Sequence, residues 1–284
     1  MYDYLQKERA CQLIQLALVE DVGRGDFTSQ ACIPVERENK VELLVKDNGV
    51  LAGVEAARWV FEVVDKSISF IPNLGEGSKI KPGDIAFYAF GNSRSILKAE
   101  RLLLNILQRM SGIATFTHSL VEKIAHTNAQ ILDTRKTTPN FRLFEKWAVK
   151  IGGGQNHRYG LFDMILLKDN HINVVGGIAN ALHETRRFLH ESGREMEVEI
   201  EVKNLDELRQ VLHIGGVKRV MFDNMTTDMI RKGVKMVEGK IETEVSGGVT
   251  EENIVALAET GVDFISVGKL THSVKSLDLS LKAI

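Results

Sequence analysis

The chain has 284 residues, of which 44% are hydrophobic and 26% charged, and its formal net charge is −2. This composition is that of a globular protein with a sizeable core, in one large or two medium domains. The slightly acidic balance argues against nucleic acid as the main partner, and no apolar run is long enough to span a bilayer.

The start of the chain predicts an amphipathic helix over residues 5–20 rather than a signal peptide, because charged residues flank its short apolar run. The two cysteines, Cys11 and Cys32, show neither metal-ligand spacing nor a disulfide framework. This usage fits a reducing, cytoplasmic location.

A turn-rich loop follows from Glu20, and the chain up to about residue 95 then predicts an α+β unit with an antiparallel sheet. Glycine and proline turns at 74–84 separate its strands. The expected strands are 41–45, 49–54, 67–71 and 85–90, with a helix over 55–64.

A strong helix is expected over 96–110, with leucines nearly all round it. Its polar residues Arg101, Asn105 and Gln108 fall on one stripe. A buried helix with a single polar stripe presents that stripe to a site or to another subunit.

Strands and helices alternate after this helix, which predicts a parallel sheet with helices outside it, most simply a barrel. The expected strands are 130–133, 164–167, 197–202, 219–223, 241–245 and 264–267, and helices are expected over 177–191, 205–214 and 251–260.

Polar residues or glycines follow each of these strands. In α/β barrels the active site forms at the C-terminal ends of the strands, so the set indicates a site more strongly than any single strand end. Its members are Arg135, Lys136, Lys168, Glu201, Asp223, Ser246, Gly247, Gly248 and Gly268.

Glutamates alternate with apolar residues along two of the strands, in EVEIEV (197–202) and around Glu242 and Glu244. If the apolar face packs against the helices, the carboxylates point into the barrel, where cations or raised pKa values must offset their charge. Lys136, Lys168 and the arginines are the expected partners. The alternative is an edge strand with a solvated glutamate face.

The stretch 133–171 groups cations around a triple glycine at 152–154. Charge-assisted hydrogen bonds from such cations suit the carboxylate or phosphate groups of a small anion. The alternative is a salt-bridged surface. The cations are Arg135, Lys136, His157, Arg158 and Lys168.

Motifs in a fixed order resemble those of the nicotinate-nucleotide pyrophosphorylase (carboxylating) family, also called quinolinate phosphoribosyltransferase. The resemblance covers nearly the whole chain. The motifs are EDVGRGDFTS (20–29), ERLLLNILQRMSGIAT (100–115), DTRKTTP (133–139), GGGQNHR (152–158), LLKDNHI (166–172), EIEV (199–202), FDN (222–224), SGG (246–248) and VGKLTHS (267–273).

The resemblance implies a type II phosphoribosyltransferase-like α/β fold: an N-terminal α/β sandwich over 1–108 and an open α/β barrel over 109–270. The tail 271–284 is expected to pack on the sandwich. It also implies transfer of the phosphoribosyl group of 5-phosphoribosyl 1-diphosphate to quinolinate with decarboxylation, giving nicotinate mononucleotide, diphosphate and CO2 in NAD biosynthesis. The implied cofactor is Mg2+.

The implied assembly is a homodimer in which each sandwich covers the other subunit's barrel, and a higher oligomer is left open. Arg101 matches the arginine that reaches the partner subunit's site and helps hold quinolinate. His272, in the THS motif, also belongs to the implied substrate-binding set.

Further roles are implied by matching motifs. Arg135 with Lys136, and His157 with Arg158, match the pairs that bind the dicarboxylate, and Lys168 matches a lysine near the reacting atoms. Glu201 and Asp223 match the acids that contact the ribose hydroxyls and the metal, and either is suited to stabilise positive charge at the anomeric carbon. The implied phosphate loops are Ser246, Gly247, Gly248 and Gly268, and the implied catalytic set is Lys136, Lys168, Glu201 and Asp223.

A few residues depart from the family pattern, namely Asn140, Gln155 and Lys269, the last beside the expected phosphate loop. The alternatives are a related transferase with another acceptor and a non-catalytic metabolite-binding subunit. A Schiff-base aldolase using Lys136 or Lys168 is less suitable, because it needs one desolvated lysine.

Overall fold

The computed structural model describes residues 5–284, so residues 1–4 at the start of the predicted amphipathic segment lie outside it. The chain divides into two compact units. Unit 1 takes the chain up to His118, Lys136–Gly153 and Lys269–Ile284, and unit 2 takes Ser119–Arg135 and Gly154–Gly268. The domain boundaries expected from the sequence stay a prediction.

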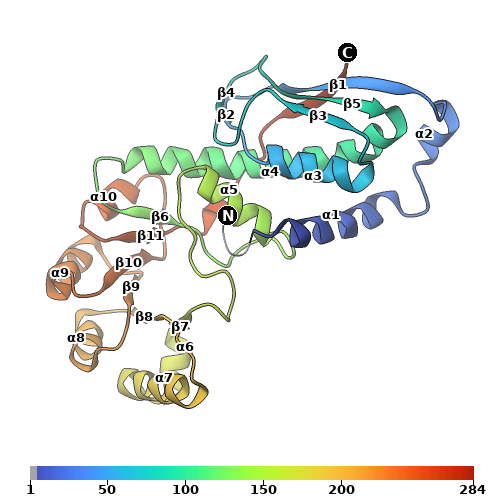
Figure 1. Ribbon diagram of the computed structural model, residues 1–284. Coiled ribbons are helices and arrows are strands. Elements are labelled where there is room, and N and C mark those ends of the chain that lie inside the picture. Colours follow the sequence, from blue (N-terminus) through green and yellow to red (C-terminus); the bar gives the residue numbers. More distant parts are fainter. Residues whose placement is uncertain (1–4) are drawn as a thin grey trace. The chain divides into compact units, whose positions relative to one another are not determined.

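Unit 1 is built on an antiparallel four-stranded sheet of order β12-β1-β5-β3, with a separate pair β2-β4 (Figure 1). The helix α4 begins in this unit and its last residues belong to unit 2. The elements are α1 (Lys7–Val22), α2 (Phe27–Cys32), β1 (Glu38–Val45), β2 (Gly49–Val50), α3 (Val54–Val64), β3 (Ser69–Pro72), β4 (Lys79–Ile80), β5 (Ile85–Asn92), α4 (Ser93–Lys123), α5 (Arg142–Ile151), α11 (Lys269–His272) and β12 (Leu279–Ala283).

The core of unit 1 is apolar. Strand β1 alternates, so that Val41, Leu43 and Val45 are buried while their neighbours are more exposed. Phe61 of α3 packs edge-on against Phe87 of β5, with ring centroids 6.4 Å apart. One sheet face is thus closed by a helix, as an alternating antiparallel strand requires.

The end of the chain returns to the first sheet. Strand β12 pairs antiparallel with β1, in a register that sets Ala283 opposite Val41 and Leu279 opposite Val45. Figure 1 shows the C-terminal segment beside β1.

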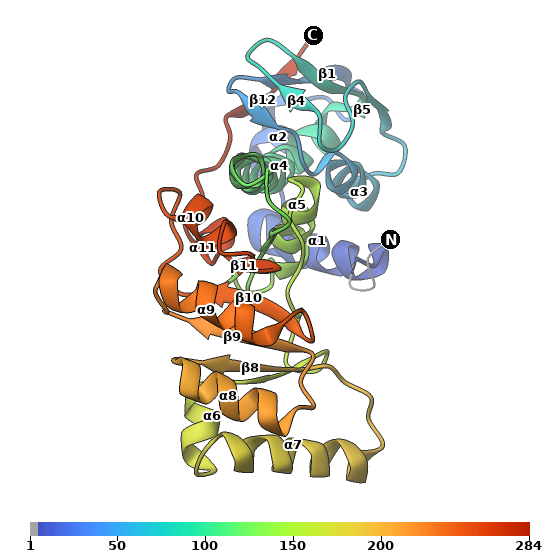
Figure 2. The ribbon, with the colours of Figure 1, turned by 90° about the vertical axis from the view of Figure 1, so that its left-hand side faces the viewer.

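Unit 2 is a parallel six-stranded sheet of order β6-β11-β10-β9-β8-β7, in which β6 and β7 form the two edges. Helices follow one face of this sheet (Figures 1 and 2). The elements are β6 (Gln130–Leu132), β7 (Ile165–Leu167), α6 (Asp169–Val174), α7 (Ile178–Ser192), β8 (Val198–Val202), α8 (Leu205–Ile214), β9 (Arg219–Asp223), α9 (Thr227–Val237), β10 (Glu242–Ser246), α10 (Ile254–Ala258) and β11 (Phe264–Ser266).

The expected α/β class with a parallel, barrel-like sheet and an N-terminal sheet domain is therefore confirmed. The strands expected in unit 2 all form, shifted by at most one residue at either end. Because β6 and β7 do not pair with each other as strands, the barrel is open, as the family resemblance implied.

Some helices differ from expectation. Helix α4 runs from Ser93 to Lys123, well beyond the expected 96–110. Helix α2 begins inside the expected loop, because the Asp26 carboxylate accepts a hydrogen bond from the Ser29 amide and caps it. Helix α5, which follows the TTP segment, was not foreseen.

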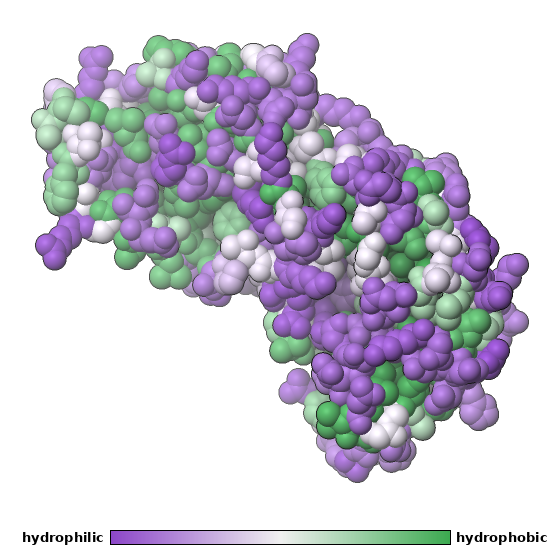
Figure 3. Space-filling model, turned by 180° about the vertical axis from the view of Figure 1, so that it is seen from behind, coloured by the Kyte–Doolittle hydropathy of each residue, from purple (hydrophilic) through white to green (hydrophobic). Residues whose placement is uncertain are grey.

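Hydrophobic areas lie between hydrophilic ones on the face seen in Figure 3. Among residues 5–284, no helix has the length and apolar character needed to cross a membrane.

Candidate active site

The acidic strand β8 is buried on both faces. Glu199 is fully buried and Glu201 is 9% exposed. The opposite face of the sheet meets the helices: on the neighbouring strand β9, Phe222 lies against Gly233 of α9, so closely that a Cβ there would come within 2.8 Å of the phenyl ring. The carboxylates therefore lie on the barrel side, and the alternative of a solvated edge strand is wrong.

Charged residues gather where β7, β8 and β9 end. Lys168 follows β7, and its ammonium group forms an ion pair with Glu201 of β8. The parallel register that pairs Leu167 with Ile200 makes the two side chains neighbours. Asp223 ends β9, and its Oδ1 accepts a 3.0 Å hydrogen bond from the side-chain Nδ2 of Asn224.

A glycine loop follows β10. Gly247 and Gly248 have φ angles of 87° and 61°, a region that favours glycine. A side chain at Gly247 would also collide with Asn224. The loop is held by Asn253, which donates to the Gly248 carbonyl at 2.9 Å. Exposed amides in such a loop are suited to bind an anion.

The loop 154–158 enters the barrel beside β6. The buried Asp133 carboxylate accepts hydrogen bonds from the His157 amide at 2.9 Å and the Asn156 side chain at 2.5 Å. The Arg158 guanidinium donates to the Met164 carbonyl at 3.1 Å. The pKa of Arg158 is lowered first by burial and then by the charge of Arg135, so two guanidinium groups share this region.

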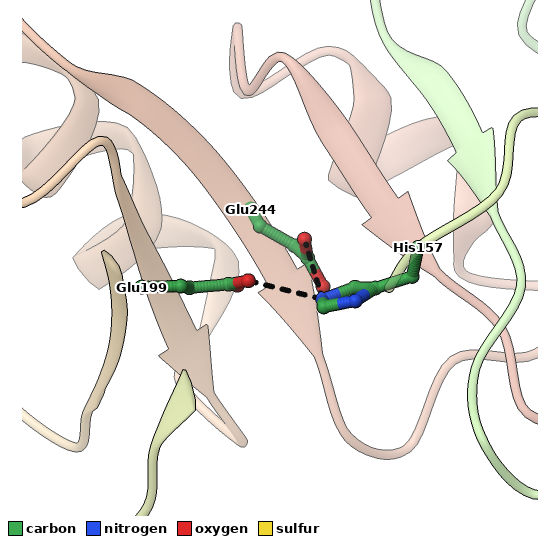
Figure 4. Close-up of side chains that lie close together, drawn as sticks. All are labelled: His157, Glu199 and Glu244. Atoms are coloured by element: carbon green, nitrogen blue, oxygen red, sulfur yellow. Dashed lines mark ion pairs between the residues drawn. The ribbon is translucent and has the colours of Figure 1, made fainter. Parts of the chain in front are cut away.

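A buried cluster joins the loop to the strands (Figure 4). His157 Nε2 lies 3.0 Å from Glu199 Oε2 and 3.6 Å from Glu244 Oε2. Arg219 Nη1 donates to Glu244 Oε2 at 2.9 Å, and the Ser266 hydroxyl donates to Glu244 Oε1 at 2.5 Å.

The acids of this cluster have raised pKa values. Burial raises the pKa of Glu199 to about 7, against an opposing effect of Arg219. Burial, followed by the charge of Glu199, raises the pKa of Glu244 to about 7. The pKa values are raised because desolvation disfavours the charged form of an acid. The cluster therefore offsets the charge of its glutamates in both of the ways expected from the sequence, by a nearby cation and by raised pKa values.

The cation that meets these acids was missed from the sequence. Arg219 begins β9, and the register places it beside Glu199 on one side and Glu242 on the other. It is 9% exposed. The position of Arg219 on its expected strand could have revealed it. A buried arginine between two strands that carry glutamates needs acidic partners.

Three predicted site residues lie in unit 1: Arg101, Lys136 and His272. Arg101 and its stripe neighbour Asn105 are exposed on α4, whereas Gln108 donates to the Leu279 carbonyl at 2.9 Å. The Lys136 and His272 side chains are also exposed. The stripe is therefore divided between a free surface and the contact with β12.

The segment that carries Lys136 is firmly held within unit 1. The Lys136 carbonyl accepts a 2.8 Å hydrogen bond from Thr271, and Thr138 donates through its amide and hydroxyl to Glu145, at 3.0 and 2.9 Å. Glu145 is fully buried and pairs with Arg109 at 2.9 Å. Sequence reasoning missed this pair, which lies on α4 and the unforeseen α5.

Acids, cations and glycine loops gather at the C-terminal ends of adjacent parallel strands, which is where α/β-barrel enzymes form their active sites. Residues 26–111 match the family model for the quinolinate phosphoribosyl transferase N-terminal domain, and residues 113–282 match that for its C-terminal domain. The chain therefore belongs to the quinolinate phosphoribosyltransferase family.

Individual relatives agree. The chain is 43% identical over 285 residues to "Quinolinate phosphoribosyltransferase [decarboxylating] 1b" of Nicotiana tabacum, covering 95% of this chain and 81% of the relative. It is 39% identical to a "Probable nicotinate-nucleotide pyrophosphorylase [carboxylating]" of Bacillus subtilis, covering 95% and 92%. The solved structure of the nicotinate-nucleotide pyrophosphorylase from Francisella tularensis superimposes with a TM-score of 0.91 at 40% identity, covering 99% of this chain and 98% of that one.

Proposed function

We propose that this chain transfers the phosphoribosyl group of 5-phosphoribosyl 1-diphosphate to quinolinate and decarboxylates the product to nicotinate mononucleotide, a step of NAD biosynthesis. The reaction is inferred from membership of the family. The observation in this structure that supports it best is the row of strand ends that sets Lys168, Glu201, Asp223 and the Gly247–Gly248 loop side by side.

Quinolinate carries two adjacent carboxylates, which need converging cations. Arg135 and Arg158 lie close enough for the charge of one to lower the pKa of the other, an unfavourable arrangement that a bound dianion would relieve. Lys168 forms an ion pair with Glu201, whose charge also acts on Arg158. Guanidinium groups bind carboxylates bidentately, so they fix the orientation of the ring as well as its charge.

Lys136 and Arg101 belong to the same proposed quinolinate site. Both side chains are exposed on unit 1, and in the proposed homodimer Arg101 is supplied to the partner's site. Its exposed position beside Asn105 supports a role at a subunit boundary, because an arginine there is free to meet a ligand or a second copy of the chain.

The sugar donor is assigned to the ends of β8 to β11. Ser246, Gly247, Gly248 and Gly268 would hold the 5-phosphate through backbone amides. Glu201 and Asp223 supply carboxylate oxygens of the kind Mg2+ prefers, and would hold it. The ion would neutralise charge on the departing diphosphate. His272 completes the proposed substrate-binding set.

The bond changes balance without a further reactant. The quinolinate nitrogen forms a bond to the anomeric carbon as diphosphate leaves, and the positive charge that develops there is stabilised by the Glu201 or Asp223 carboxylate. The C–CO2 bond then breaks, its electron pair stays on the ring carbon beside the positively charged ring nitrogen, and that carbon takes a proton from solvent water. Lys168 and Lys136 orient the departing carboxylate.

A cytoplasmic location is also proposed. Cys11 and Cys32 are both free thiols, as expected in a reducing compartment. The names of some plant relatives place those proteins in chloroplasts or mitochondria. The subcellular location therefore varies among the relatives.

The test is to mix purified protein with quinolinate, the sugar donor and Mg2+ and to follow nicotinate mononucleotide by chromatography. Product that disappears when nicotinate replaces quinolinate supports the proposal. No product, with the sugar donor still bound, would overturn it in favour of a related transferase with another acceptor.

The assigned acids have their own test. Glu201→Ala and Asp223→Ala should each lower kcat by about 100-fold or more while changing the KM for quinolinate much less, because charge stabilisation acts in the transition state. Glu197→Ala, at an exposed position before β8, is the matched control and should keep wild-type kcat. Equal losses in kcat and in quinolinate binding would contradict the assigned role.

A further inference from the structure

Arg109, on α4, contacts two segments of unit 1 that are far apart in the sequence, the one that contains α5 and the tail that follows β11. Its Nε and Nη2 donate to Glu145 Oε1 in α5, at 3.1 and 2.9 Å. Its Nη1 donates to the Val274 carbonyl at 3.2 Å, and Nη2 also donates to the Thr271 carbonyl. One side chain of α4 therefore holds both segments.

These hydrogen bonds use nearly all the donors of the Arg109 guanidinium. The N–H group on Nε, one on Nη1 and both on Nη2 are engaged, which leaves one N–H group of the side chain. The edge formed by Nε and Nη2, with which an arginine grips a carboxylate of a ligand, faces Glu145 instead. Arg109 is therefore suited to hold the protein and not to bind a substrate directly.

Glu145 extends the contact to the segment that carries Lys136. Its carboxylate is fully buried. Oε2 accepts a 3.0 Å hydrogen bond from the Thr138 amide, and Oε1 accepts one of 2.9 Å from the Thr138 hydroxyl. Thr138 lies two residues after Lys136, so the buried acid fixes the backbone next to this lysine.

The tail is held at the residue before His272. The Thr271 carbonyl accepts from Arg109, and the Thr271 hydroxyl donates to the Lys136 carbonyl at 2.8 Å. Helix α11, which contains both Thr271 and His272, lies against α5. The side chains of Lys136 and His272 are exposed, so the network fixes the backbone from which each of them projects.

We propose that Arg109 is a positioning residue that sets the backbones carrying Lys136 and His272 relative to each other. The proposal rests on the proposed function, in which Lys136 binds quinolinate and His272 lies with the residues that hold the sugar donor. An arginine bonded to one segment would affect one substrate. Because Arg109 is bonded to both segments, its removal weakens the binding of both substrates, although it touches neither.

The first test is Arg109→Met, which keeps much of the side-chain length but none of the donors. The dissociation constants of quinolinate and of the sugar donor with Mg2+, measured separately by titration calorimetry, should each rise about tenfold or more, because a loosened segment must be ordered again on binding. The matched control is Lys123→Met, which removes an exposed cation from the last turn of the same helix. It should change either constant less than about twofold.

The second test, Glu145→Gln, loosens one segment alone. The amide keeps an oxygen for Arg109 but sets an N–H group against the Thr138 amide, which the carboxylate accepted. The dissociation constant of quinolinate should rise about fivefold or more and that of the sugar donor less than about twofold, because only the segment of Lys136 loses a bond. A general loss of stability would weaken both substrates alike, so this split distinguishes positioning from a purely structural role.

Two results would overturn the proposal. If Arg109→Met weakens one substrate only, or neither, the guanidinium does not place both segments. If Glu145→Gln weakens both substrates equally, the ion pair acts on stability alone, and this variant decides the question where Arg109→Met does not fold. A wild-type protein that binds neither quinolinate nor the sugar donor refutes the proposed function instead, which separates the two failures.

Hydrogen exchange tests the same contacts without a ligand. In Arg109→Met, the amides of 137–141 and of 271–277 should exchange about tenfold faster than in the wild type, whereas those of β5 should keep their rates. Unchanged exchange in either segment would contradict its attachment through Arg109.

Discussion

In unit 1, strand β1 buries Val41, Leu43 and Val45 against an apolar core, while in unit 2 the neighbouring buried positions of β8 include Glu199 and Glu201. Both strands alternate between polar and apolar residues. In β1 the buried face is apolar, whereas β8 also buries its glutamates. The difference separates two tasks. Apolar burial stabilises a sheet without regard to chemistry, whereas buried acids cost stability and are kept where a site needs them in fixed positions.

The compensation for these acids is local. Arg219 forms ion pairs with Glu242 and Glu244, and Lys168 forms one with Glu201. In addition, the pKa values of Glu199 and Glu244 are raised, which favours their neutral forms. Unit 1 has a smaller counterpart in the pair Arg109–Glu145, which holds the segment carrying Lys136. In both units, ion pairs with a buried carboxylate therefore hold segments that carry proposed binding residues.

The largest expected effect comes from removing the buried cation of unit 2. Arg219→Met keeps much of the side-chain length but leaves Glu244 and Glu242 without their guanidinium partner, so we expect the free energy of unfolding to fall by about 3–5 kcal/mol. Urea unfolding measures this loss. The double variant Arg219→Met/Glu244→Gln should recover part of it, and a single-variant loss below about 1 kcal/mol would show that the cluster is not a charge-balanced core.

The matched change in unit 1 is Leu43→Ala, at a fully buried position of β1. Loss of buried methyl groups and the resulting cavity should cost about 2–4 kcal/mol. Because no charge is involved, the cost should be the same at pH 5 and pH 8 and at low and high salt. A cost that varied with pH as strongly as that of Arg219→Met would remove the contrast between the two cores.

The raised pKa values predict a dependence of stability on pH. Glu199 and Glu244 have folded pKa values of about 7 against an ordinary value of 4.5, so the folded state binds more protons than the unfolded state between these values. Their contribution is fully present below about pH 4.5 and is lost as the pH rises through 7, a decrease of up to about 3 kcal/mol for each group.

The slope is measured by urea unfolding between pH 5 and pH 8 and compared with that of Glu244→Gln, which should be shallower whatever its absolute stability. Carboxyls with lowered pKa values, such as Asp26 and Asp65, titrate below their ordinary value of 3.8 and so outside this window. Equal slopes in the two proteins would contradict the assignment for Glu244.

The smallest effect is expected at an exposed ion pair of unit 2, Lys123–Glu251, whose nitrogen and oxygen are 2.7 Å apart with side chains 38% and 47% exposed. Lys123→Ala should cost at most about 0.5–1 kcal/mol, and that cost should shrink at 1 M salt. A loss comparable with that of Arg219→Met would show that burial is not what distinguishes the cluster.

Local patterns predicted the strands of unit 2 well. Strand β9 and helix α8 begin and end at the expected residues, because short apolar runs bounded by turns fix both their type and their ends. Helix α5 was missed although Leu143, Phe144 and Trp147 have helical spacing, since the buried Glu145 and Lys146 beside them obscured an amphipathic pattern.

The sequence by itself determined the family, the alternating strands and the residues at the strand ends, because motifs and periodicity are local properties of the chain. Only the tertiary structure decided which partner each charge has. The pairing of Arg219 with Glu244 and of His157 with Glu199 joins residues 25 and 42 positions apart, and such contacts depend on strand register and sheet order. The sequence shows on which strand and on which face of it a residue lies. The protonation state and the role of its side chain depend on the neighbours that folding brings to it.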